Sequence, residues 1–115
     1  APRAVRERQP ERERAGLDAF VRAGCPDCHA PPAFTSLGEH PIATVFPDAE
    51  PPEGAVVLDA PSLRGVVLSA PYLFDGRAET LLDVLTTHNE RDRHGHTAAL
   101  TDDERSDLVV FLESL

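Results

Sequence analysis

Apolar side chains recur with helical spacing near both ends of the chain. Leu17, Phe20 and Val21 stand at positions i, i+3 and i+4, and Gly24 follows as a helix stop. We therefore expect a first helix from about residue 11 to Gly24. Near the other end, residues 101–104 have the sequence of a capping box, and the helix they open places apolar residues at i, i+3, i+4 and i+7, namely Leu108, Phe111, Leu112 and Leu115.

A third stretch, from Thr80 to His88, also has helical spacing. Its apolar residues Leu81, Val84 and Leu85 lie one turn apart, and His88 continues their face by another turn. The pattern predicts a helix in which His88 is the polar end of an apolar stripe. Residues 89–100 are mostly polar and predict a loop.

The middle of the chain is rich in proline. Residues 30–71 hold eight of the eleven prolines, at positions 31, 32, 41, 47, 51, 52, 61 and 71. This density excludes long helices and central strands. Because a compact domain rarely carries some forty residues without regular structure, we expect this segment to wrap around something other than itself.

Length and charge set the domain organisation and the classes of partner. A chain of 115 residues corresponds to one domain. Residues 1–14 are mostly charged and predict a frayed or extended arm, followed by a single domain over residues 15–115. Residues 23–115 carry sixteen acidic residues against five arginines, which disfavours nucleic acid and anionic membranes and favours a partner with a basic docking patch. No apolar run approaches the length of about 18 residues that a membrane span needs.

The strongest chemical signal is the segment Cys25-Pro26-Asp27-Cys28-His29. Two cysteines three positions apart with a following histidine are the attachment signature of a c-type haem: each thiol adds to one vinyl group, and the imidazole becomes an axial iron ligand. A redox dithiol and a zinc site are the alternatives. The chain has no second cysteine pair for a zinc ribbon and no βαβ pattern around the motif.

Beyond this motif, the chain resembles the C-terminal haem domain of the bacterial di-haem cytochrome c peroxidase and MauG family. The resemblance covers residues 17–115 and is carried by AGLDAFVRAGCPDCHAPPAFT, APSLRGVVLSAPYLFDGRAETLLDVL and LTDDERSDLVVFLESL. It implies an all-α, class I cytochrome c-like fold: N- and C-terminal helices, a helix carrying the sixth iron ligand, and a long Pro-rich loop around one covalently bound haem c.

In that family the sixth ligand follows the PY…DG turn, usually as Met and in MauG-like members as Tyr. The matching position is His88, and the chain contains no Met. We therefore expect His29 and His88 to ligate the iron. His94, in the polar loop, is the next candidate, ahead of His40.

The resemblance assigns further haem contacts. Arg64 matches a position near the haem propionates, although a surface arginine is an equal alternative, and Tyr72 matches a residue that packs beside the haem without ligating it. Phe20 and Leu63 complete the expected haem-binding residues.

Together these features predict a mono-haem electron-transfer domain with low-spin, bis-histidine iron. The alternative is a peroxidase-like enzyme with an open or displaceable distal site. The family's turnover takes place at a second haem, whereas this chain has one CxxCH, so we expect no catalytic residues here. Because haem is attached to CxxCH outside the cytoplasm, we expect a periplasmic or otherwise exported protein. Because the sequence begins at Ala1 without an initiator Met, we expect either a processed protein or a domain of a larger redox protein.

Overall fold

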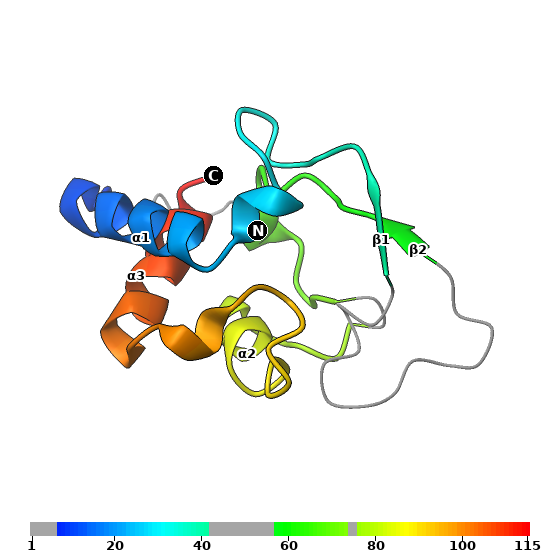
Figure 1. Cartoon of the computed structure of the whole chain (residues 1–115). Helices are drawn as coiled ribbons and strands as arrows, with labels where there is room; N and C mark the ends of the chain where they lie inside the picture. The colour runs from blue at the N-terminus through cyan, green and yellow to red at the C-terminus, as the bar shows by residue number, and fades with distance from the viewer. Residues whose placement is uncertain (1–6, 42–56, 74–75) are drawn as a thin grey trace.

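The computed structural model describes residues 7–41, 57–73 and 76–115, and these form a mostly helical domain (Figure 1). No helix in these ranges has both the length and the apolar character needed to cross a membrane. The α-helices are α1 (Pro10–Arg22), α2 (Leu81–Leu85) and α3 (Asp102–Glu113). Short elements connect them: the 3-10 helices η1 (Cys25–Asp27), η3 (Val66–Leu68) and η4 (Thr97–Ala99), and the strands β1 (Glu39–Pro41) and β2 (Val57–Asp59).

Helices α1 and α3 pack directly against each other, as Figure 1 shows. Their backbones approach closely at Gly16, where an added Cβ would lie 2.0 Å from the carbonyl oxygen of Asp107. At the edge of this contact, Arg12 Nε donates to Asp107 Oδ1 at 2.8 Å. The predicted N- and C-terminal helices are both present, and the structure shows that they pack together.

Part of the predicted charged arm is helical. Helix α1 begins at Pro10, and Pro is well suited to the first helical position because it has no N–H to leave unpaired. The Glu13 carboxylate is buried, accepts from the Gln9 backbone N–H at 2.8 Å and pairs with Arg8 at 2.6 Å. Residues 10–14 thus belong to α1 rather than to an arm, and the helix begins close to residue 11, where the sequence pattern turned helical. The bonds from Gln9 and Arg8 to Glu13 stabilise the first turn of α1. The i, i+3 and i, i+4 charge pairs in the sequence did not predict this stabilisation.

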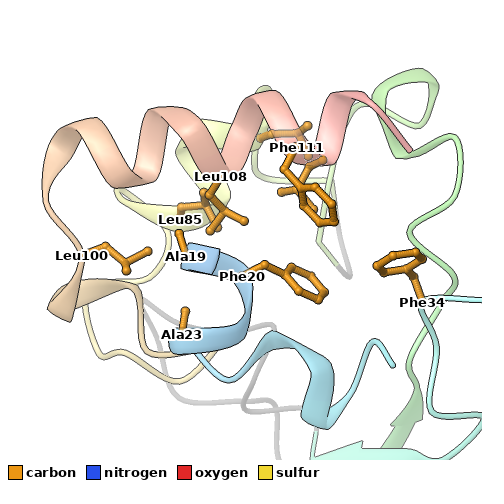
Figure 2. Packing of buried hydrophobic residues seen from close by; sticks show 10 residues of the cluster. Ala19, Phe20, Ala23, Phe34, Leu85, Leu100, Leu108 and Phe111 are labelled. Carbon is orange, nitrogen blue, oxygen red and sulfur yellow. The ribbon is translucent and has the colours of Figure 1, made fainter. Parts of the chain in front are cut away.

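The core lies between α1, α3 and the segment after the haem motif (Figure 2). Its centre is a group of three aromatic rings. Phe20 lies 5.3 Å from Phe111 and 5.8 Å from Phe34 between ring centroids, and both pairs are inclined rather than parallel, as aromatic quadrupoles favour. Both predicted ends are confirmed: Gly24, in the left-handed conformation, follows the C-cap of α1, and the capping box at Thr101 opens α3.

The predicted helix over residues 80–88 is shorter than expected. Helix α2 ends at Leu85, and the Thr86 hydroxyl bonds back to the Leu82 carbonyl oxygen at 2.8 Å. The His88 N–H then bonds to the Asp83 carbonyl oxygen at 2.9 Å, one residue further back than in an α-helix. His88 therefore lies in a turn, out of the helical phase that the apolar stripe predicted.

The described parts of the Pro-rich middle are irregular, as predicted, except for the 3-10 helix η3 and one short ladder. Strands β1 and β2 pair antiparallel, with His40 opposite Leu58, so the domain is mostly helical rather than all-α. The prolines at 47, 51 and 52 lie outside the described residues. Next to the ladder, the Thr35 hydroxyl donates to the Ala60 carbonyl oxygen at 2.5 Å. This bond joins the chain before β1 to the chain after β2.

Candidate functional site

A cavity of about 450 Å³ opens in the described part of the chain, a volume typical of sites for cofactors and other small molecules. Residues from α1, α2, α3 and the Pro-rich segment line it. Most of them are apolar, including Phe20, Ala60, Pro61, Leu63, Val66, Tyr72, Leu73, Leu81, Val84, Leu85, Leu108 and Leu112. Such a wall can bury a large hydrophobic ring system.

The CxxCH segment forms one side of this cavity. Helix η1 turns the chain tightly after α1, with the Cys28 N–H and the His29 N–H both bonded to the Cys25 carbonyl oxygen, at 3.2 and 2.9 Å. This turn brings Cys25, Cys28 and His29 to the cavity together. The CxxCH spacing therefore places both thiols and the imidazole on the same wall of the cavity.

The two thiols are partly buried and have raised pKa values. Both are free, burial raises the pKa of Cys25 to about 11, and burial also raises the pKa of Cys28. Redox-active dithiols instead have a lowered thiol pKa. Within the described ranges, no three His, Cys, Asp or Glu residues are grouped as a metal site would require. These findings favour neither the dithiol nor the zinc alternative.

His29 is oriented by two backbone carbonyls. Its Nδ1 lies 3.2 Å from the Phe34 oxygen and 3.1 Å from the Pro61 oxygen. With the ring proton on Nδ1, His29 donates to these carbonyls and its Nε2 lone pair stays free. Metal-ligating histidines are commonly oriented in this way, by a hydrogen bond from the nitrogen that does not bind the metal. Burial lowers the pKa of His29 and so favours the neutral ring that metal binding needs.

His94 lies across from His29 and also lines the cavity. The two ring centroids are 6.5 Å apart and the ring planes differ by 20°. The Nδ1 atom of His94 is buried and has no hydrogen-bond partner among the described residues. Burial, together with the nearby His29, lowers the pKa of His94 to about 4, so this imidazole is neutral at ordinary pH.

The other residues expected at the site divide into two groups. Phe20, Leu63 and Tyr72 line the cavity. His88 and Arg64 are not among its lining residues. Arg64 instead donates twice to the Pro32 carbonyl oxygen, at 2.9 Å from Nε and 2.6 Å from Nη2, and lies over the Phe34 ring at 5.5 Å.

Two further polar residues line the cavity: His40, the last of the candidate ligands, and Arg93, which the sequence did not single out. His40 reaches it from β1, with Nδ1 3.3 Å from Cys28 Sγ, and Arg93 reaches it from the loop that carries His94. No periodicity points to either residue. Their positions follow from how the loops fold onto the cavity, although the position of Arg93 beside a candidate ligand was a signal that sequence reasoning did not use.

Comparison with known proteins gives a consistent picture. No protein family model matches the chain. The chain is 43% identical over 58 residues to hydrazine synthase subunit gamma of Kuenenia stuttgartiensis, over 50% of the chain and 16% of that protein. It is 30% identical over 118 residues to cytochrome c551 peroxidase of Pseudomonas aeruginosa, over 90% of the chain and 33% of that protein.

A second cytochrome c551 peroxidase, from Nitrosomonas europaea, is 29% identical over 90% of the chain and 34% of its own length. Among solved structures, a xenon-pressurised hydrazine synthase from Kuenenia stuttgartiensis superposes with a TM-score of 0.73 and 25% identity, over 91% of this chain and 46% of that one. The chain spans about a third or less of the length of these curated relatives. It is a distant homologue of the cytochrome c551 peroxidases and of hydrazine synthase subunit gamma.

Proposed function

We propose that this chain is a mono-haem c-type cytochrome domain that transfers electrons. The observation that carries the proposal is the position of the CxxCH segment: both thiols and the His29 imidazole lie on the wall of a largely apolar cavity. Distant homology to proteins named cytochrome c551 peroxidase supports the same assignment.

The residues fit a covalently bound haem c. Cys25 and Cys28 would hold it through thioether bonds, and His29, oriented by the carbonyls of Phe34 and Pro61, would be the proximal ligand. Phe20, Leu63 and Tyr72 would contact the macrocycle. The bound group supplies an iron that changes its charge by one electron, and the protein controls its potential through axial ligands and burial.

A carrier fits the site better than an enzyme does. A second imidazole lies opposite His29 in the cavity, and occupation of both axial positions would leave no place for peroxide. A peroxidase-like domain with a displaceable distal ligand is the second candidate, favoured by the activity for which two relatives are named. As a carrier, the acidic domain would exchange electrons with a basic partner protein or a neighbouring domain, in the periplasm or another exported location.

Acid-acetone extraction of the protein, produced with a haem c maturation system, tests the proposal. The haem should stay with the polypeptide, whereas replacing both Cys25 and Cys28 with Ser should release it. A Ser36→Ala variant is the matched control and should keep its haem, because Ser36 bonds to His40 outside the CxxCH motif. Complete extraction of haem from the unmodified chain would rule out covalent attachment.

Rapid mixing with peroxide separates the two candidates. The resting, haem-loaded domain should consume peroxide slowly and reduce or oxidise a partner quickly. Fast consumption of peroxide by the same sample would favour the enzyme.

A further inference from the structure

We infer that His94, rather than His88, is the second axial ligand of the haem iron, and that Asn89 is the positioning residue that presents it. The inference rests on the proposed haem site. It assigns a role to the loop between α2 and η4, in which the sequence offered His94 only as the second candidate after His88.

The separation of the two cavity histidines matches a shared metal ion. A metal–imidazole bond is about 2 Å long and the ring centre lies roughly 1 Å behind the nitrogen, so two imidazoles on opposite sides of one ion have centroids about 6 Å apart. The observed distance between the His29 and His94 centroids is 6.5 Å. The spacing of the two rings is therefore of the size that one shared iron requires.

The remaining histidines are placed less well. His40 has both ring nitrogens near polar neighbours, with Nδ1 3.3 Å from Cys28 Sγ and Nε2 2.9 Å from Ser36 Oγ. The His96 side chain is 74% exposed and pairs with Asp92 at 3.2 Å. His88 lies in the turn after α2 and does not line the cavity. Only His94 combines a place on the cavity wall with a buried ring nitrogen that lacks a partner within the described structure.

The loop that carries His94 is closed around Asn89, which is 4% exposed. Asn89 Nδ2 donates to the carbonyl oxygens of His94 and Gly95, at 3.0 and 3.2 Å, and to Thr97 Oγ1 at 2.8 Å. Asn89 Oδ1 accepts from the His94 N–H at 2.9 Å. One buried amide thus holds the backbone on both sides of His94.

The same loop is attached to the segment that carries the haem motif. The His96 N–H donates to the Ala23 carbonyl oxygen at 2.8 Å. At Gly95 the backbone has φ +72° and runs so close that an added Cβ would lie 3.5 Å from that oxygen and 3.7 Å from Cys25 Sγ. This contact holds the loop beside the CxxCH turn and so limits how far His94 can move relative to His29.

Electron paramagnetic resonance of the ferric, covalently haem-loaded protein tests the assignment. His94→Ala should convert the low-spin signal to a high-spin one, and added imidazole should restore it. His88→Ala is the matched control and should remain low-spin. Acid-acetone extraction is carried out first on the unmodified protein, and loss of its haem would refute the proposed function. Retained haem with an unchanged low-spin signal in His94→Ala would refute only the ligand.

Variants at His94 and Asn89 test the assignment if His94→Ala does not incorporate haem. His94→Met keeps a possible ligand, and it should give the spectrum of a histidine–methionine haem with a raised reduction potential; an unchanged spectrum would overturn the assignment. Asn89→Ala should give a mixture of low-spin and high-spin iron that added imidazole makes fully low-spin, and Asn89→Asp should restore part of the low-spin fraction because it keeps the acceptor for the His94 N–H. A fully low-spin Asn89→Ala protein would remove Asn89 from the proposal.

Discussion

Gly16 of α1 lies so close to Phe111 of α3 that a Cβ added at position 16 would come within 2.6 Å of the Phe111 Cβ. The same atom would lie 2.0 Å from the backbone oxygen of Asp107, which cannot move without shifting α3. Glycine is therefore needed at this crossing because the helix backbones are nearly in contact. Since Phe111 also packs on Phe20, the crossing fixes the aromatic group beside the cavity.

Gly16→Ala should destabilise the domain by at least about 1 to 3 kcal/mol, the usual cost of overpacking. Chemical denaturation monitored by far-ultraviolet circular dichroism measures the change. Ala15→Ser adds one atom at the neighbouring exposed position and should have little effect. Equal stability of Gly16→Ala and the unmodified protein would show that the two helices are less closely packed than described.

The capping box at the start of α3 should contribute measurably to stability. Thr101 Oγ1 accepts from the Glu104 N–H at 3.1 Å, and the Thr101 N–H donates to Glu104 Oε1 at 2.9 Å. Thr101→Ala removes the side-chain acceptor and should cost about 1 kcal/mol in the free energy of unfolding. Thr87→Ala, at an exposed turn position, is the control. An equal loss of unfolding free energy in Thr101→Ala and Thr87→Ala would show that the capping hydrogen bonds do not stabilise the domain.

Glu104 should make stability depend on pH. The Thr101 N–H and then the Arg22 guanidinium lower the pKa of Glu104 below its ordinary value of 4.5. A carboxylate with a lowered pKa in the folded state stabilises the fold above its ordinary pKa, and this stabilisation is lost as the pH falls through the folded-state pKa. Glu104→Gln should therefore be less stable than the unmodified protein at neutral pH, and the difference should shrink below pH 4.5. Denaturation at several pH values would detect it; a difference that stays constant with pH would contradict the assignment.

The acidic charge should control association with a redox partner. With a net charge of −9, the domain should attract a basic partner strongly at low ionic strength. The second-order rate of electron exchange should fall by about tenfold or more between roughly 0.01 M and 0.15 M salt, because screening shortens the range of the attraction. Stopped-flow measurements with a basic cytochrome test this, with an uncharged small reductant as the control. A rate that does not change with salt would exclude electrostatic steering.

Sequence patterns were enough to predict the features of this protein that depend on residues close together in the chain. The helix end at Gly24 and the capping box at Thr101 depend on residues within a few positions of each other, and both are present where the pattern predicted them. The CxxCH turn likewise needs only a five-residue segment, and it brings its thiols and imidazole to one cavity wall. The apolar spacing was likewise sufficient to predict both terminal helices.

Only the tertiary structure decided which side chains meet across the cavity. The apolar stripe extended the helical phase to His88, but α2 ends at Leu85, so that phase no longer applies. His94 reaches the cavity because the buried amide of Asn89, five residues earlier, closes its loop, and because a backbone bond from His96 to Ala23, distant in the sequence, holds that loop in place. Helical periodicity predicts the face on which a residue lies only as long as the helix continues. A loop's path depends instead on hydrogen bonds to elements that become neighbours only after the chain has folded.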